Sequence, residues 1–341
     1  MIQYGFKGWD MKKIFSAITL LLLLLTAASC TKEHTTETAI VANKTVSAGE
    51  NEYPHEPIKI IVAYKEGGRT DIGARILCKV AQKYSTVPLV IKNISGADGE
   101  LGYTMLLKAK PDGYTIGFIN IPTFLALPMK WETMYDCEDI EPIANLVYDP
   151  SVLVVLRSKE IDSYEDFIEE AKNNPYMLMV GNNGYGASDH IAAASLAQKA
   201  GIEITHIPYV VSTDMLVALR NGQVDALISK ASEVSNEEDL ACLCVFTDER
   251  LDCLPAVPTL KEKGIDFTFG SARALVAPKG TDKEAIQYLS DLFQKAMEDE
   301  EMQKLARENG MNLQYLDAMQ LKEYIEEWKH YITNVVPSLP L

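Results

Sequence analysis

The chain has 341 residues, of which 47% are hydrophobic and 23% are charged, as in ordinary globular proteins. Its formal net charge of −16 argues against nucleic acid as a partner, because affinity for a phosphate backbone comes from basic patches that release counterions. Small anions stay possible ligands, since local dipoles and amides set the field inside a binding site. The length suits two domains of typical size after an N-terminal leader.

The N-terminus predicts an exported, lipid-anchored protein. Two lysines at 12–13 precede a largely apolar run, residues 14–28, that contains six consecutive leucines and is short for a membrane span. Small residues then lead to Cys30, in a pattern that resembles a bacterial lipobox. We therefore predict a signal peptide over residues 1–30 with lipidation at Cys30. The alternative is an ordinary signal peptide cut shortly before Cys30.

Residues 31–52 are polar and show neither helical nor strand periodicity. This composition predicts a flexible tether that holds a folded body away from the membrane. We thus expect an extracytoplasmic protein at the membrane surface, in the periplasm or on the cell surface.

From residue 53, strand-like runs alternate with helical patterns. The nearly continuous apolar run at 58–64 predicts a strand buried on both faces. Further strands are expected at 89–91 and 114–119, and helices at 71–84 and 101–110. Such alternation is typical of a parallel sheet covered by helices.

A second series has the same pattern, with strands at 152–156, 178–180, 204–207 and 224–228. Ser163 and Asp166 predict a capping box at one helix start, and Ser188 and Gly201 predict the cap and the end of another.

The C-terminal part returns to strands, at 243–246 and 274–277, and then to two long helices. Thr281 and Glu284 predict a capping box for the first helix, and Asp317 is expected to cap the second.

The sequence therefore predicts an α/β protein of two lobes, each a mainly parallel sheet flanked by helices. No internal repeat and no long linker separates the lobes, so we expect strands to cross between them as a hinge. We predict that residues 53–147 plus 246–341 form lobe 1 and that residues 148–245 form lobe 2.

Two strand-to-helix joints carry the candidate ligand-binding residues. The first joint supplies Tyr64, Gly67, Gly68, Arg69, Thr70 and Asp71, and the second supplies Gly184, Gly186, Ala187 and Ser188. Each joint has glycines where the backbone must turn tightly or approach a ligand, and each precedes a helix whose N-terminal amides favour an anion. In open α/β sheets, ligands bind at the carboxyl ends of strands, where these joints lie.

The joints could instead be structural turns, a catalytic site or a metal site, and only the first of these alternatives stays open. Either joint alone could be a purely structural turn, but one in each lobe of an exported protein favours a carboxylate site. Ser188 and His190 resemble a nucleophile elbow only superficially, because residues two apart on a helix point to different faces. The five histidines lack metal-binding spacing, so we expect no metal, no cofactor and no catalysis.

Five cysteines follow Cys30, an odd number that indicates free thiols in an exported protein. Cys242 and Cys244 alternate within an apolar strand-like run, so core packing is a better explanation than metal binding or redox chemistry.

The sequence resembles the substrate-binding proteins of tripartite tricarboxylate transporters, the Bug or TctC family. The resemblance runs from residue 53 to about 336. It is carried by Gly67-Gly-Arg-Thr-Asp71, Asn93-Ile-Ser-Gly-Ala-Asp-Gly99, Lys110-Pro-Asp-Gly-Tyr-Thr115, Gly184-Tyr-Gly-Ala-Ser188, Asn221-Gly-Gln-Val-Asp225 and Leu254-Pro-Ala-Val-Pro-Thr-Leu260.

The resemblance implies a type II periplasmic-binding-protein fold with strands crossing between the lobes. It also implies a monomer that holds a small carboxylate through the two joints and delivers it to integral membrane transporter subunits. Arg69 stands where the family usually has a small residue. Its guanidinium could reach a second ligand carboxylate, or instead point to solvent or pair with Glu66. A lipoprotein that senses the ligand for a signalling partner is the alternative function.

Overall fold

The structure, a computed structural model, describes residues 53–157, 161–184, 186–209 and 212–338. The predicted signal peptide, Cys30 and the tether lie outside the described residues. Within the described ranges, no helix combines the length and apolar character that a bilayer crossing requires.

Two sheets share one long strand. The first sheet has the order β2-β1-β3-β9-β4-β10, formed by β1 (Ile58–Val62), β2 (Leu89–Asn93), β3 (Thr115–Ile121), β4 (Ile140–Leu156), β9 (Gly270–Pro278) and β10 (Leu313–Leu316). The second has the order β8-β4-β7-β5-β6, formed by the same β4 with β5 (Met179–Asn182), β6 (Thr205–Pro208), β7 (Ala226–Lys230) and β8 (Leu240–Val245).

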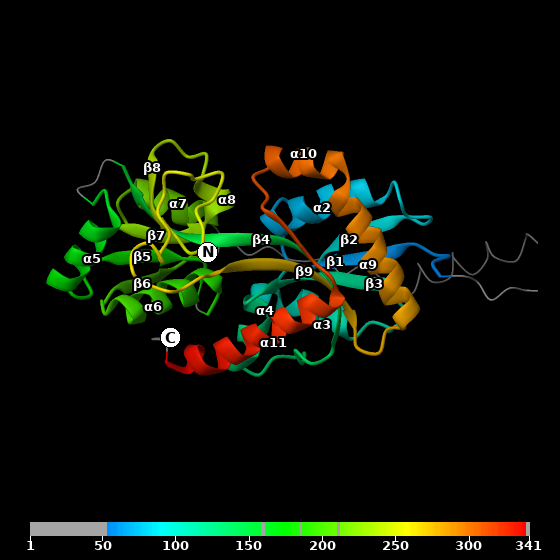
Figure 1. Ribbon diagram of the computed structural model, residues 1–341. Helices are drawn as coiled ribbons and strands as arrows, with labels where there is room; N and C mark the ends of the chain where they lie inside the picture. The colour runs from blue at the N-terminus through cyan, green and yellow to red at the C-terminus, as the bar shows by residue number, and fades with distance from the viewer. Residues whose placement is uncertain (1–52, 158–160, 185, 210–211, 339–341) are drawn as a thin grey trace, which may run out of the picture. The chain divides into compact units, whose positions relative to one another are not determined.

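Helices cover both faces of the first sheet (Figure 1), as the apolar run of β1 predicted. Ile58, Ile60 and Val62 pack into one core and Ile61 into another, because successive strand residues point to opposite faces. The first core lies under α2 (Arg69–Ala81), α9 (Lys283–Glu298) and α10 (Glu300–Glu308). The second core lies against α3 (Glu100–Leu107) and α4 (Thr123–Lys130). The short 3-10 turn η1 (Ala97–Gly99) precedes α3.

The second sheet is also covered on both sides. Its alternate residues pack against α5 (Tyr164–Asn173) and α6 (Ser188–Ala200) on one face, and against α7 (Ser212–Arg220) and α8 (Ala231–Val234) on the other. Leu153 belongs to the first of these cores, while Val152 and Val154 belong to the second. The alternation of strands and covering helices predicted for both lobes is confirmed.

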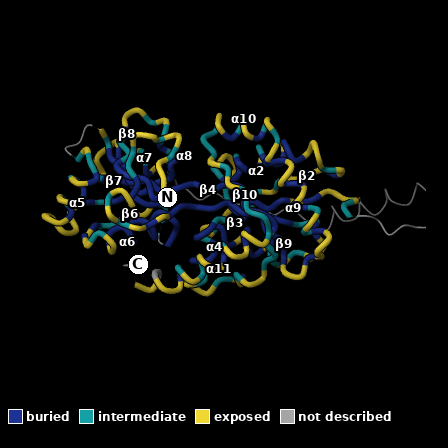
Figure 2. Tube along the Cα trace, viewed as in Figure 1, coloured by how far each residue is buried: buried dark blue, intermediate teal, exposed yellow. Residues whose placement is uncertain are grey.

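The crossing between the sheets is made by buried strands. Along β4, residues 140–150 pair antiparallel with β9, and residues 151–155 pair antiparallel with β7. Parallel pairs remain farther out, where β1 joins β2 and β3 and where β5 joins β6 and β7. Figure 2 shows β4 as a largely buried tube that runs through both halves.

The hydrogen bonds around Phe246 and Phe269 bear on where the chain returns from lobe 2 to lobe 1. Phe246 N donates to Ser151 O, and Phe269 N donates to Phe246 O, both at 2.9 Å. Between them, Lys263 pairs with Glu165 of α5 at 2.7 Å, so the segment 247–268 stays with the second sheet. We propose that the C-terminal part of lobe 1 begins near Phe269.

The last helix, α11 (Ala318–Val335), is followed by the short turn η2 (Val336–Ser338) and touches elements of both sheets. Asp317 accepts the N–H groups of residues 319 and 320, which confirms the predicted cap. Farther along, the Tyr331 hydroxyl lies 2.9 Å from Ser195 Oγ of α6. The helix therefore runs from β10, beside β4 of the first sheet, to a helix that covers the second.

Two other predicted caps have different outcomes. The Ser163–Asp166 capping box is present. The box predicted at Thr281 is wrong, because Asp282 accepts Glu284 N and the Thr281 hydroxyl instead donates to Pro278 O at 2.7 Å.

The five described cysteines are free thiols. Cys78 and Cys244 are buried in apolar cores, and burial raises the pKa of Cys78 to about 12. The predicted core packing is therefore confirmed for Cys244, whereas Cys242 is only partly buried and Cys253 is exposed.

Candidate functional site

The first joint, between β1 and α2, is braced from within by Asp71. One carboxylate oxygen accepts Gly67 N and Arg75 Nε, each at 2.9 Å, and the other accepts Asn93 Nδ2 at 2.9 Å. Burial opposes ionisation, but these donors outweigh it and hold the pKa of Asp71 below its usual value. Asp71 thus supports the joint backbone from the side of its own sheet.

Tyr64 and Thr70 are also held by neighbours of the first sheet. The Tyr64 hydroxyl lies 2.8 Å from the Tyr103 hydroxyl, and burial raises the pKa of Tyr64 to about 12. Thr70 Oγ1 lies within hydrogen-bond distance of the Asn120 amide, at the end of β3. Both side chains are fixed before any ligand arrives.

Two glycines of the second joint, between β5 and α6, need a backbone that other residues rarely adopt. Gly184 has φ +110° and Gly186 has φ +65°. Gly186 N donates to His190 Nδ1 at 2.8 Å, so His190 braces the turn.

Ser188 does not cap α6 as predicted. Ala187 occupies the N-cap position, and Ser188 is the first helical residue, with its Oγ 3.3 Å from Asn183 Nδ2. Asn183 Oδ1 instead accepts the first-turn amide of Asp189 at 3.0 Å. The cap is therefore supplied by an asparagine five residues before the helix.

The second joint meets the first half of the protein through the long side chain of Lys130. A β-carbon placed on Gly186 would lie 2.5 Å from Cδ of Lys130, which belongs to α4 of the first half. Gly186 is thus a point of close approach between the halves. Gly68 differs: its φ of −73° suits any residue, and the predicted need for glycine there does not hold for the backbone angle.

Arg69 belongs to the first half, and its side chain reaches the second half. Its guanidinium donates to the Ser232 carbonyl in α8 and, at 3.1 Å, to the Asn309 carbonyl after α10. The predicted alternative pairing with Glu66 is wrong, because Glu66 pairs with Arg75 at 3.0 Å. Arg69 is the first helical residue of α2, and its guanidinium thus binds one carbonyl oxygen in each half of the protein.

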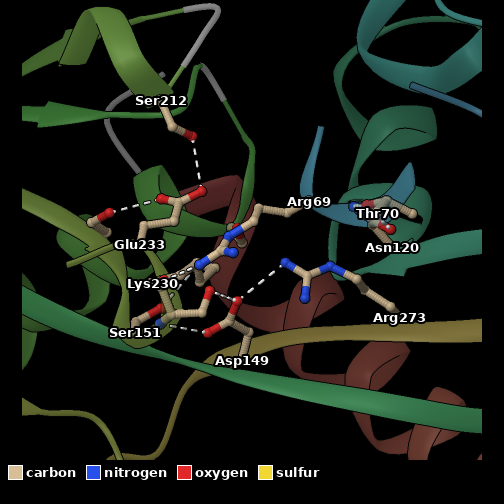
Figure 3. A network of polar contacts seen from close by, with 12 residues as sticks. Arg69, Thr70, Asn120, Asp149, Ser151, Ser212, Lys230, Glu233 and Arg273 are labelled. Atoms are coloured by element: carbon tan, nitrogen blue, oxygen red, sulfur yellow. Dashed lines mark hydrogen bonds and ion pairs between the residues drawn. The ribbon is translucent and has the colours of Figure 1, made fainter. Parts of the chain in front are cut away.

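Beneath this contact lies a buried ion pair of the crossing strands (Figure 3). Asp149 of β4 accepts Arg273 Nη2 of β9 at 3.1 Å, and it also accepts the backbone N–H and hydroxyl of Ser232. Arg273 is only 7% exposed, and its Nε has no partner among the described residues. A buried, partly unpaired guanidinium beside the joints is a donor to which an anion could bind.

A second buried pair lies on the other half. Lys230 at the end of β7 donates to Asp189 in the first turn of α6 and to Ser151 Oγ at 3.1 Å. Burial raises the pKa of Asp189 to about 6, with Lys230 opposing the shift and Glu233 adding to it. Asp189 and Lys230 are thus a buried ion pair beside the second joint (the Lys230 end is drawn in Figure 3).

Sequence reasoning missed the four charged residues of these two pairs: Asp149, Asp189, Lys230 and Arg273. Lys230 and Arg273 are the single charged residues of largely apolar strands, and Asp149 lies in the mostly apolar second part of β4. A charge at such a position is costly unless it is paired. That isolation was the available signal. Their pairing, at separations of 41 and 124 residues, was not visible in the sequence.

The site is equipped to bind an anion by hydrogen bonds. The N-cap residues of α2 and α6, Gly68 and Ala187, offer no side-chain acceptor to the helix amides, whereas α5, α9 and α10 begin with capping serine or aspartate side chains. Helix N-termini favour negative charge, and in α6 the Asp189 amide is already taken by Asn183 Oδ1 while the other first-turn amides lack an acceptor from the N-cap residue. The N-termini of two helices and two buried ion pairs, Arg273–Asp149 and Lys230–Asp189, thus lie near the crossing strands.

Three surface hollows lie elsewhere, with volumes of about 450, 410 and 650 Å³. None of these three is lined by residues of the two joints. The contacts of Arg69 and Lys130 occupy the region between the joints, so the chemistry of the side chains, rather than an open hollow, identifies the site.

Comparisons with known proteins agree with this arrangement. A family model described as "Tripartite tricarboxylate transporter family receptor" matches residues 74–339. Protein BugT of Bordetella pertussis is 31% identical over 253 residues, which cover 72% of this chain and 78% of BugT.

Solved structures show the same fold. A TctC solute-binding protein from Polaromonas superposes with a TM-score of 0.73 and 29% identity, covering 84% of this chain and all of the other. An R. palustris protein solved with adipate has a TM-score of 0.75 and 25% identity over 84% of this chain and 98% of its own. The predicted two-lobed binding-protein fold is thereby confirmed.

Proposed function

Because this chain belongs to the tripartite tricarboxylate transporter receptor family, a family of solute-binding proteins and not of enzymes, we propose that it captures a small carboxylate between its two lobes. We further propose that lipidation of Cys30 anchors it outside the cytoplasm and that it delivers the ligand to integral membrane transporter subunits. The adipate bound by the R. palustris protein supports the ligand class.

What supports the proposal is that each half carries donors in a joint at a helix N-terminus, and that Arg69 of the first joint reaches the second half. The first joint supplies the α2 amides and Arg69; the second supplies the α6 amides and Ser188. A carboxylate can accept from several N–H donors at once, and charged donors give the stronger bonds.

Capture follows because these donors belong to different halves of the protein, which the crossing strands connect. A ligand that contacts both joints stabilises the form in which the lobes are together, while one that contacts only one joint does not. The β4 strand continues from the first sheet into the second, so it is an element about which we expect the lobes to move.

Arg69 is expected to exchange partners on binding. Its two acceptors are main-chain carbonyl oxygens, one in each half, and a carboxylate presents two oxygens in the geometry that a guanidinium prefers. A ligand carboxylate that replaces one carbonyl would keep the guanidinium satisfied. This supports ligands with two carboxylates, one at the helix amides and one at Arg69.

A thermal-shift screen against mono-, di- and tricarboxylates, amines and neutral sugars tests the proposal. At 100 times Kd, a ligand that binds only the folded protein adds about 2.7 kcal/mol to its stability. We expect stabilisation by at least one carboxylate. Stabilisation by amines or sugars alone would contradict the proposal.

Arg69→Ala tests the site itself by calorimetry with the best di- and monocarboxylate. Loss of a charge-assisted bond should weaken dicarboxylate binding by about tenfold to a hundredfold. Arg250→Ala is the matched control, because Arg250 forms an exposed pair with Glu262 at 2.8 Å. Equal small losses for both ligands would place Arg69 outside the contact.

A further inference from the structure

A hollow of about 450 Å³ lies on the side of the crossing strands away from the carboxylate site. Tyr148 of β4 lines it, whereas the next residue, Asp149, belongs to the buried pair at the site. Adjacent strand residues point to opposite faces, which places the hollow behind the crossing. Its volume falls within the range of small-molecule sites.

The walls of this hollow are unusually aromatic. They include five rings from β4, α11 and the segment before β9: Tyr148, Phe269, Tyr324, Trp328 and Tyr331. Trp328 packs edge-on against Phe269, with ring centroids 4.9 Å apart, and against Tyr331, at 5.6 Å. The faces of such rings carry negative charge and attract cations.

The charged groups at the hollow have one sign. Asp248 and Glu327 line it, and none of the described residues that line it is a lysine or an arginine. Asp248 Oδ1 forms an ion pair with Lys261 Nζ at 2.8 Å, but both side chains are more than half exposed. Exposed pairs of this kind are weak enough to exchange partners. A cation in the hollow would thus meet ring faces and two carboxylates.

From these three features we propose that the hollow is a second ligand site, which takes a small organic cation of the quaternary ammonium type. Aromatic faces and carboxylates recognise this class together: the rings attract the charge and cover the methyl groups, and the acids offset the charge. The occupant would touch α11, which begins beside the first sheet, and the segment 247–269, most of which stays with the second sheet.

The probe is choline, and its control is 3,3-dimethylbutan-1-ol, which has the same shape without the charge. Both are titrated into the purified protein at constant ionic strength, with saturation-transfer NMR and tryptophan fluorescence as readouts. We expect saturable choline binding about tenfold tighter than binding of the neutral alcohol. Absence of saturable binding, or equal binding of the two compounds, would overturn the proposal.

Variants then locate the bound choline. Asp248→Asn combined with Glu327→Gln changes two exposed side chains and should weaken choline binding about tenfold without affecting the fold. The matched control is Glu249→Gln combined with Glu326→Gln, which removes the neighbouring charges outside the hollow. Choline affinity that is unchanged by the first pair, or lowered equally by both pairs, would assign the binding elsewhere and refute the site.

Discussion

The two joints, which we propose to hold the ligand together, have different supports. At the first joint, Asp71 holds the turn through two N–H donors of its surroundings and through Arg75, whose side chain is 45% exposed. At the second, Asp189 and Lys230 are both at least 95% buried. One support therefore rests on hydrogen bonds near solvent, and the other on a desolvated ion pair.

The difference matters because a buried charge depends on its partner. Water can replace an exposed partner, so losing it costs little, whereas a buried charge that loses its partner keeps the full desolvation penalty. Changes near the second joint should thus affect the stability of the protein more than equivalent changes near the first.

The largest effect is expected for Lys230→Met, which leaves Asp189 buried without a cation. Removing one partner of a buried pair costs roughly 3–5 kcal/mol of unfolding free energy. Urea denaturation at pH 7 measures the loss, and Lys279→Met, from an exposed pair 3.8 Å long, is the control. A loss as small as that of the control would show that the Asp189–Lys230 pair is not what braces the second joint.

The next effect is the dependence of stability on pH. Burial, opposed by Lys230, raises the pKa of Asp189 to about 6 in the folded protein. A raised carboxyl pKa contributes stability that is full below the unfolded pKa and is lost as the pH rises through about 6; a shift of this size corresponds to at most roughly 3 kcal/mol. Comparing wild type with Asp189→Asn between pH 4 and 7 isolates this contribution.

Asp71 provides the opposite sign for the same experiment. Its folded pKa is lowered, so its contribution is present above the unfolded pKa and is lost as the pH falls toward the folded value. Asp71→Asn should therefore remove stability at pH 7 that wild type itself loses only in acid. A pH profile of the same sign for both residues would contradict the distinction between the joints.

A smaller effect is expected at the glycines of the two joints. Gly186→Ala must hold alanine at φ +65° and displace Lys130, so we expect a loss of about 1–2 kcal/mol in stability together with weaker ligand binding. Gly68→Ala keeps an ordinary φ, and its new β-carbon lies 3.3 Å from Lys65 O. Thermal unfolding and ligand titration of both variants should separate them; equal effects would mean that backbone conformation does not distinguish the joints.

Local patterns were enough to predict most of the fold. The apolar run of β1, the Ser163 capping box and the end of α6 at Gly201 each rest on neighbours a few residues apart. The helix α4 was missed because Pro128 interrupts its pattern. β4 was predicted five residues long and is 17, since its first half contains polar residues that the crossing buries.

The site could be predicted only in part, for a related reason. The joints have a local signature, glycines between a strand and a helix, and the sequence identified both. The partners of Arg69, by contrast, are 163 and 240 residues away along the chain. Which carbonyl a long guanidinium reaches is decided by how the two halves pack, and no pattern within one segment records it.

The smallest effect is expected for Arg75→Met at the first joint. Asp71 keeps Gly67 N and Asn93 Nδ2 as donors, and the lost partner is nearly half exposed, so the cost should be at most ~1 kcal/mol. High salt should reduce the cost further, because it screens exposed charges, while the effect of Lys230→Met should persist. Lys79→Met, one turn later on α2 and paired with Glu301 at 2.7 Å, is the matched control. At 1 M salt the Debye length falls to about 3 Å. If the cost of Arg75→Met equals that of Lys230→Met and persists at this salt concentration, the first joint also depends on a desolvated pair. The contrast between the two joints would then fail.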